Sequence, residues 1–189
     1  MDKEKKLIDG LRGIIPSLHT PFCNQNKIDI PSLKNLIDHT ITTGCSGMLV
    51  GAVAGENSSL SFEEKKMIID ECSSYNKNRI PIIISCSAKN QKDRIALAKS
   101  AKEAGADWIL CQTPENVSGS ELLQCFNEIA EAGPHNLMIQ DLSWTDNGMS
   151  DEDIMLLFEN INKFRACLLY TSDAADDLLC VDLGGRRII

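Results

Sequence analysis

The sequence lacks several features that would assign it to a common functional class. No apolar run approaches the ~18 residues of a membrane-spanning helix, and the amino-terminal MDKEKKLIDGLRG has charges but no apolar signal-peptide core. Basic residues are also scarce, with 19 Lys and Arg against 27 Asp and Glu, which argues against a nucleic-acid or anionic-membrane surface. We expect a cytoplasmic protein whose partners are small molecules or like subunits, with no nucleic acid and no membrane.

Cysteine is present, but without the spacing of a metal site or a disulfide framework. The eight cysteines include no C-x-x-C pair, which is typical of a reducing compartment. Cys86 in IIISCSA and Cys111 in WILCQT lie within apolar runs and are interpreted as small core residues. His19, His39 and His135 are scattered without ligand spacing. We therefore expect no metal site and no cofactor.

Apolar residues follow two alternating periodicities along the chain. Short runs typical of strands buried on both faces occur at 13–18, 47–50, 80–85, 108–111 and 137–139. Segments with helical spacing separate them, with apolar positions at Leu33, Leu36, Ile37 and Ile41; Ala98 and Ala101; Leu122, Leu123, Phe126 and Ile129; and Ile154, Leu157, Phe158 and Ile161. Repeated strand–helix units predict parallel α/β structure, either a doubly wound open sheet or a (β/α)8 barrel. The lack of G-x-G-x-x-G after the first run disfavours dinucleotide binding.

The ends of the predicted helices carry recognisable signals. The residues at 61–64 and 118–121 read S-F-E-E and S-G-S-E, which predicts a capping box at each helix start. Gly44, Gly105 and Gly133 follow helical stretches, and we expect each to end its helix in the left-handed conformation.

Three longer stretches are informative in combination. They are LHTPF at 18–22, GAVAGENSSLSFEEK at 51–65, and RIPIIISCSAKNQKDRIALAKSAKEAGADWIL at 79–110. The second contains the pattern G-E-x-x-x-L-x-x-E-E, and the third contains A-K-x-A-x-x-A-G-A-D. Together they resemble the dihydrodipicolinate synthase and N-acetylneuraminate lyase family of Schiff-base aldolases and lyases. The resemblance covers roughly residues 10–166.

The resemblance implies a (β/α)8 TIM barrel with its active site at the carboxyl ends of the strands. A complete barrel of this kind has about 250 residues, so we expect this chain to hold a barrel truncated to five strand–helix units and the start of a sixth strand. The family's substrates are small 2-keto acids, and its members imply a homo-oligomeric parent protein.

The family's sixth strand carries the lysine that condenses with the keto acid, and many relatives have a segment like K-F-R-A-x-K there. Here Lys163-Phe164-Arg165-Ala166 is followed by Cys167 and Leu168. We therefore expect no catalytic residue in the chain and no activity. Lys163 is not a substitute, because it precedes the strand at the end opposite the active site.

The sequence after Ala166 has a second resemblance. CLLYTSDAAD at 167–176 and VDLGGRRII at 181–189 resemble a translated sequencing-library adaptor on either side of a variable index. We expect two regions: a partial barrel at 1–166 and a non-native, adaptor-like tail at 167–189. The alternative is a genuine sixth strand at 168–170 followed by a helix at 173–180, which would not restore the amine.

Three hydroxyl positions of the family's synthase members are changed. Their two threonines correspond to Val53 and Ala54, the relay tyrosine of the fifth strand to Gln140, and a second relay tyrosine to the Glu115-Asn116 pair. Glutamine does not titrate usefully and cannot shuttle a proton as a phenol can. The resemblance therefore implies a keto acid other than that of the lysine-biosynthesis synthase.

Five residues are the candidate substrate-binding set. Gln140 and Asp141 are expected to read polar groups of the substrate, with a space-filling role for Gln140 as the alternative. The backbone amides of Val53 and Ala54 are expected to hold a carboxylate. Thr20 is expected either to orient a site residue or to cap its loop.

Two further functional hypotheses remain open. A catalytically silent module on a partial barrel would bind a keto acid, or regulate, without forming an imine. A doubly wound binding domain is the fallback if the family resemblance misleads, since a fold class alone implies no function.

Overall fold

Five parallel strands form one sheet in the computed structural model, which describes residues 11–24, 26–142 and 148–169. Each strand pairs with the next in the chain, in the order β1-β2-β3-β4-β5. A doubly wound sheet would reverse its strand order at a switch point, and this order has no reversal. The strands are β1 Met48–Val50, β2 Ile82–Ser85, β3 Trp108–Gln112, β4 Asn136–Asp141 and β5 Phe164–Leu169.

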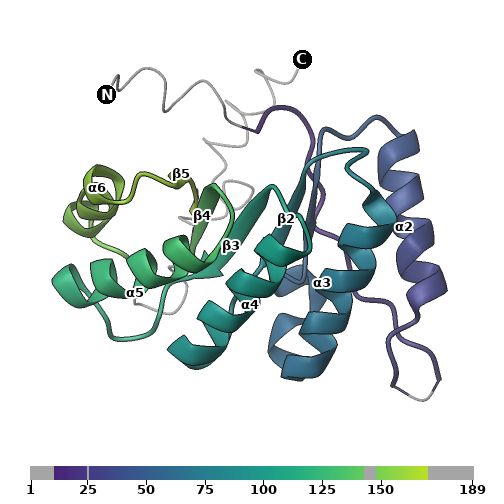
Figure 1. Cartoon of the computed structure of the whole chain (residues 1–189), viewed down its shortest axis with the longest axis horizontal. Helices are drawn as coiled ribbons and strands as arrows, with labels where there is room; N and C mark the ends of the chain where they lie inside the picture. The colour runs from purple at the N-terminus through teal and green to yellow at the C-terminus, as the bar shows by residue number, and fades with distance from the viewer. Residues whose placement is uncertain (1–10, 25, 143–147, 170–189) are drawn as a thin grey trace, which may run out of the picture.

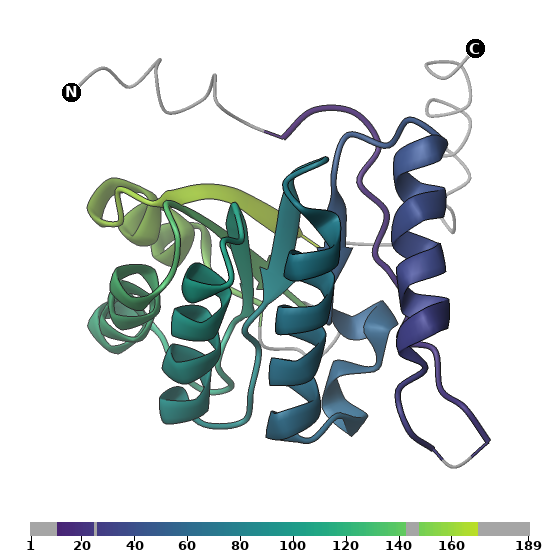
Figure 2. The same ribbon diagram turned by 45° about the vertical axis from the view of Figure 1, so that its right-hand side comes forward.

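The helices lie side by side along one face of this sheet (Figures 1 and 2). The apolar cluster on that face contains residues of the strands and the helices, whereas the cluster on the opposite face contains no helical residue. In the part of the chain that the structure describes, helices therefore cover one face alone, which argues against the fallback with helices on both faces. None of the helices in the described ranges is long and apolar enough to cross a membrane. The helices are α2 Ile30–Thr42, α3 Phe62–Asn76, α4 Gln91–Glu103, α5 Gly119–Ala132 and α6 Asp151–Asn160, with short 3-10 turns η1 Val53–Gly55 and η2 Asn57–Ser59.

Successive strand residues alternate between the two faces, as the pleat requires. Ile84 and Ile109 pack under the helices, while their neighbours Ile83 and Leu110 belong to the cluster on the other side, which we call the inner face. All four are at most 1% exposed. Burial on both sides explains why the strands appear in the sequence as continuous apolar runs.

The first predicted strand, at 13–18, is only partly formed. It makes a single parallel bridge, between Ser17 and Leu49, and the Leu49 N–H donates to Pro16 O at 2.9 Å. Pro16 has no N–H and cannot donate in return, which interrupts a regular ladder. The segment nevertheless lies beside β1, where a first barrel strand belongs.

One of the two predicted capping boxes is present. Ser61 Oγ accepts from the Glu64 N–H at 3.3 Å, and the Glu64 carboxylate accepts from the Ser61 N–H at 2.8 Å, so α3 begins as predicted. The hydrogen bonds that the Glu64 carboxylate accepts from the Ser61 N–H and the Ser61 hydroxyl lower the pKa of Glu64. Ser118 is the N-cap of α5, but its side chain makes no capping hydrogen bond, and the prediction of a box there was wrong.

Two of the three predicted glycine helix ends are left-handed. Gly44 has φ of 81° and Gly105 has φ of 80°, but Gly133 has φ of −84° and ψ of −178°, which is extended backbone. Gly133 does follow the end of α5, but the prediction that it is left-handed was wrong. Packing favours glycine there, because a Cβ at Gly133 would lie 2.4 Å from Ile109 Cδ1, and the Ile109 side chain would have to shift.

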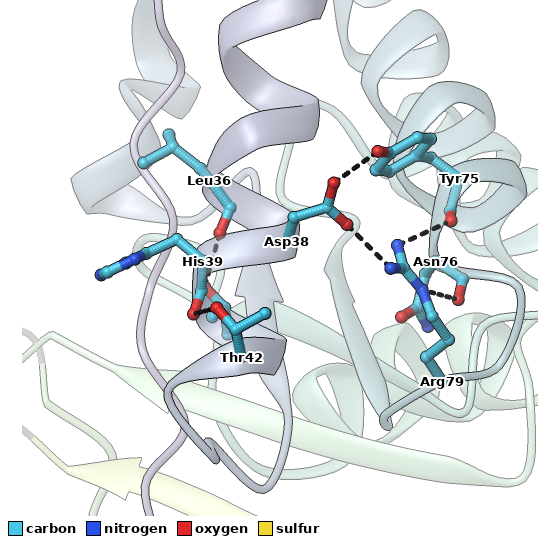
Figure 3. A network of polar contacts seen from close by, with 8 residues as sticks. Leu36, Asp38, His39, Thr42, Tyr75, Asn76 and Arg79 are labelled. Atoms are coloured by element: carbon cyan, nitrogen blue, oxygen red, sulfur yellow. Dashed lines mark hydrogen bonds and ion pairs between the residues drawn. The ribbon is translucent and has the colours of Figure 1, made fainter.

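A polar cluster joins α2 to α3 (Figure 3). The Asp38 carboxylate accepts from Tyr75 Oη at 2.5 Å and from Arg79 Nη1 at 2.7 Å. The Arg79 guanidinium also lies over the Tyr75 ring, 5.2 Å from its centroid. The hydrogen bond from Tyr75, followed by that from Arg79, lowers the pKa of Asp38.

Strand β5 continues three residues beyond Ala166. Cys167 pairs with Ile139, and Leu168 pairs with Gln140. Of the alternative strand at 168–170, residues 168 and 169 are thus extended, whereas Tyr170, the alternative helix at 173–180 and most of the predicted tail lie outside the described residues. The boundary after Ala166 stays a prediction.

Candidate functional site

The candidate site lies at the carboxyl ends of the strands, because parallel strands bring those ends to a single edge of the sheet. Gln112 and Gln140 stand directly opposite each other there, and Leu168 stands opposite Gln140. Met138 belongs to the inner-face cluster, so Gln140, two residues later, points to the inner face as well. We call Gln112, Gln140 and Leu168 the inner rim.

Two primary amides meet in the inner rim. Gln112 Nε2 lies 3.4 Å from Gln140 Oε1, a long hydrogen bond. Thr113 fixes the adjoining backbone, since its N–H and its hydroxyl donate to Gln140 O at 3.1 and 3.0 Å. Gln140 is 6% exposed. Such a pair can donate and accept hydrogen bonds but cannot exchange protons at neutral pH.

Asp141 points away from the inner rim. It follows Gln140 in the strand and shares the helix-facing side with Ile139. Its Oδ2 accepts from the Met149 N–H at 3.0 Å, and its Oδ1 lies 3.5 Å from Thr113 Oγ1. The carboxylate thus joins the residues that follow β3 to the segment before α6. Its predicted contact with a substrate stays a prediction.

Leu168, the residue that the resemblance aligns with the family's lysine, is 38% exposed. Its neighbour Cys167 packs against the helix-side core. Burial, together with the negative charge of Asp141, raises the pKa of the Cys167 thiol to about 11. This thiol is therefore protonated at neutral pH and is a poor nucleophile.

Lys163 lies at the other end of the sheet, as expected. Its Nζ donates to Ala130 O at 2.6 Å and to Gly133 O at 3.1 Å, so it caps the carboxyl end of α5. Burial lowers its pKa, but the ammonium group satisfies helix carbonyls and is directed away from the inner rim.

The loop after β1 contains the predicted residues Val53 and Ala54 within η1. Val53 is 42% exposed. Ala54 O is 2.9 Å from His19 Nδ1, and Thr20 Oγ1 donates to Gly55 O at 2.7 Å. Of the two roles expected for Thr20, the structure supports the one in holding the loop. The predicted carboxylate contact of the 53–54 amides stays a prediction.

Sequence reasoning missed a polar network beneath this loop. Lys65 Nζ donates to Asn57 Oδ1 at 2.9 Å and to Ser87 O at 3.0 Å, while Asn57 Nδ2 donates to Gly51 O at 2.6 Å. Ser87 Oγ in turn accepts from the Gln112 N–H at 3.0 Å. The network connects the ends of β1, β2 and β3, and burial lowers the pKa of Lys65. The sequence signal that could have indicated this network is the polar S-C-S at 85–87, which follows the apolar run of β2.

A groove of about 950 Å³ lies near these loops, on the helix side of the strand ends. It is lined by residues of three loops and helix starts, including Phe62, Lys65, Arg94, Thr113 and Cys125. Gln112 lines this groove, whereas the other two residues of the inner rim, Gln140 and Leu168, do not. Within the described ranges, no three His, Cys, Asp or Glu side chains gather as a metal site would require.

Comparisons with known proteins agree with this architecture. The 4-hydroxy-tetrahydrodipicolinate synthase of Bartonella tribocorum is 31% identical over 155 residues, which cover 80% of this chain and 53% of that protein. The crystal structure of dihydrodipicolinate synthase from Aquifex aeolicus superposes with a TM-score of 0.79 at 25% identity, covering 90% of this chain and 59% of that one.

A third relative was crystallised with a ligand. The dihydrodipicolinate synthase from Acinetobacter baumannii complexed with pyruvate gives a TM-score of 0.77 at 27% identity, over 92% of this chain and 60% of that chain. The chain thus spans about half the length of the curated relatives that it matches. The sequence model of the Dihydrodipicolinate synthetase family matches residues 10–167. Because that match runs from the segment beside β1 into β5, the chain belongs to the dihydrodipicolinate synthetase family.

Proposed function

We propose that the family residues of this chain come from a lyase that forms an imine with a 2-keto acid such as pyruvate, and that the 189-residue chain itself forms no such imine. The family match and the pyruvate complex of the Acinetobacter baumannii relative support the first part. The observation that carries the second part is Leu168, which stands opposite Gln140 and which the resemblance aligns with the family's lysine.

The chemistry requires an amine at that position. A neutral lysine attacks the keto carbon and water leaves. The protonated imine then accepts the electron pair of a bond that breaks at the neighbouring carbon, and the resulting enamine donates that pair when a new bond forms there. The hydrocarbon side chain of Leu168 cannot attack. Cys167 is a partly buried thiol whose raised pKa keeps it protonated, and Lys163 caps a helix at the opposite end. Neither offers a replacement nucleophile.

The inner rim accounts for substrate recognition in this proposal. A 2-keto acid presents a carboxylate and a carbonyl oxygen, and both accept hydrogen bonds. Gln140, supported by Gln112, supplies amide N–H donors to the substrate. The amides of Val53 and Ala54 hold the carboxylate, while Thr20 and Asp141 position the surrounding loops.

The changed hydroxyl positions set the substrate apart from that of the lysine-biosynthesis synthase. An amide at Gln140 cannot relay the protons that a tyrosine would, so we infer a different 2-keto acid or aldehyde partner. The parent protein is a homo-oligomer. The free thiols at Cys45, Cys72, Cys86, Cys111, Cys125 and Cys167 support a reducing compartment such as the cytoplasm. Residues 167–189 are an adaptor-like tail.

The decisive experiment reads the uninterrupted gene past Ala166. We expect a lysine two residues after Ala166, and we expect the protein expressed from that gene to be inactivated by borohydride in the presence of pyruvate. An alanine in place of that lysine should abolish trapping. A continuation without a lysine at that position would refute the proposed imine chemistry.

A silent keto-acid-binding module is the second candidate. It is favoured by one observation, the paired amides of Gln112 and Gln140 on an inner face without the amine. Calorimetry separates the two. Pyruvate binding by the 189-residue chain, without a borohydride-stable adduct, would support the module, and an absence of binding would count against it.

A further inference from the structure

Two cysteines lie side by side beneath the rim. Ser85 pairs with Leu110 across β2 and β3, and the next residue of each strand is a cysteine, Cys86 and Cys111. The Cys86 N–H donates to Leu110 O at 2.8 Å, which continues the parallel pairing by one residue. Both thiols are free and fully buried.

Each thiol donates to a backbone carbonyl, Cys86 Sγ to Leu110 O at 3.3 Å and Cys111 Sγ to Gln112 O at 3.5 Å. The neighbouring thiol of Cys111, together with burial, raises the pKa of Cys86. The neighbouring thiol of Cys86 lowers the pKa of Cys111 against the opposing effect of burial, and the positive charge of Arg94 also lowers it. Cys111 is therefore the thiol that ionises first, and Cys86 is its immediate neighbour.

The spacing of the two strands suits a disulfide. Neighbouring strands lie about 4.7–4.9 Å apart, and a disulfide joins Cα atoms that are about 4.4–6.8 Å apart. Cys86 lies one residue beyond the end of β2, where the backbone is less constrained by the ladder. A bond between the two sulfurs therefore requires side-chain rotation and little movement of the strands.

We propose that Cys86 and Cys111 form an oxidation site at which a small peroxide converts the two thiols to a disulfide. The Cys111 thiolate attacks one peroxide oxygen, the other oxygen leaves as water after protonation, and a sulfenic acid remains. Cys86 then attacks the sulfenic sulfur, and a second water leaves. Two thiols and one hydrogen peroxide thus give one disulfide and two waters.

The position of Cys86 and Cys111 near the strand ends determines how peroxide reaches them and which loops a disulfide would affect. The groove described above is lined by Ala88 and Gln112, which follow the two cysteines closely in sequence, but by neither cysteine. Both thiols are 0% exposed, so the proposal requires the strand ends to open locally before a small peroxide reaches Cys111. The disulfide would lock the ends of β2 and β3 next to Ser87 and Gln112, whose hydrogen bond links the loops. This inference does not depend on imine chemistry.

The test treats the folded full-length chain with hydrogen peroxide, alkylates the remaining thiols, and maps peptides without reduction. We expect two of the eight thiols to escape alkylation, a cross-linked peptide containing Cys86 and Cys111, and recovery of both thiols with dithiothreitol. Cys86→Ala and Cys111→Ala should abolish this peptide. Cys125→Ala, which changes a groove cysteine outside the pair, should leave it unchanged.

The result on the unsubstituted chain decides the matter whether or not the variants fold. Peroxide treatment that leaves all thiols alkylatable would overturn the proposal. So would sulfinic acid at Cys111 without a cross-link, or cross-links distributed over unrelated cysteine pairs.

Discussion

At the scale of single residues, position 168 determines what the inner rim can do. A lysine there would face Gln140 across one pair of strands, whereas Leu168 places a hydrocarbon at the same position. The surrounding polar groups, Gln112 and the Lys65 network, hold loops together but supply no amine to the inner face. In our proposal, a single side chain therefore decides whether a member of this family can form an imine.

Gly133 tests how tightly the helix layer is packed. A methyl group at Gly133 would collide with Ile109 Cδ1, so Gly133→Ala should lower the free energy of unfolding by about 1–3 kcal/mol, measured by urea denaturation. Ile109→Val removes that Cδ1. Gly133→Ala should therefore lower the free energy of unfolding by less in the Ile109→Val background. An equal loss in both backgrounds would contradict the packing explanation.

Asp38 makes stability depend on pH in a defined direction. The pKa of Asp38 is lowered in the folded state. The ionised side chain therefore stabilises the fold fully at pH values above the ordinary aspartate pKa of 3.8. This stabilisation is lost as the pH falls through the lower folded-state pKa. Asp38→Asn should reduce the urea midpoint at neutral pH, and the difference from the unsubstituted chain should shrink under acid conditions. Asp70→Asn, an exposed change on α3, is the matched control, and a constant difference for Asp38→Asn would refute the prediction.

The sequence located residues at the strand ends better than it located the directions of their side chains. Gln140 was expected at the mouth and lies in the inner rim. Asp141 was grouped with it, although adjacent strand residues point to opposite faces, and the structure directs it to Met149. The contacts of Lys65 with Asn57 and Ser87 join different loops, and local sequence patterns carry no information on such pairings.

At the scale of elements, α3 and α5 provide a comparison of helix starts. Ser61→Ala removes a side chain that caps α3 and should destabilise the protein by about 1 kcal/mol. Ser118→Ala removes a serine whose side chain makes no capping bond, and its effect should be much smaller. Urea denaturation of both variants measures the difference. Equal effects would show that the capping box of α3 contributes nothing of its own.

Strand and helix positions followed from periodicity, because burial on one or both faces leaves a direct pattern in the sequence. The run at 13–18 is the exception, since its apolar pattern is correct but Pro16 cannot complete a ladder. The S-x-x-E pattern at 118–121 likewise matched a capping box that did not form. Local patterns therefore located elements and were less reliable for the hydrogen bonds at their ends.

At the scale of the whole molecule, strand order was the feature that periodicity left open. A doubly wound sheet and a barrel share the same alternation of strands and helices. They differ in which strands pair, which is a non-local property. The sequential order β1-β2-β3-β4-β5 and the single helix layer select the barrel architecture, in agreement with the resemblance carried by residues 51–65 and 79–110.

The most direct test of the central claim is borohydride trapping on the purified 189-residue chain. The chain is incubated with pyruvate, reduced, and examined by intact mass and peptide mapping, with an intact family member as the positive control. We predict no pyruvate adduct at any single lysine of the chain, while the control protein is modified at its active-site lysine. A stoichiometric adduct on one lysine of this chain would contradict the account.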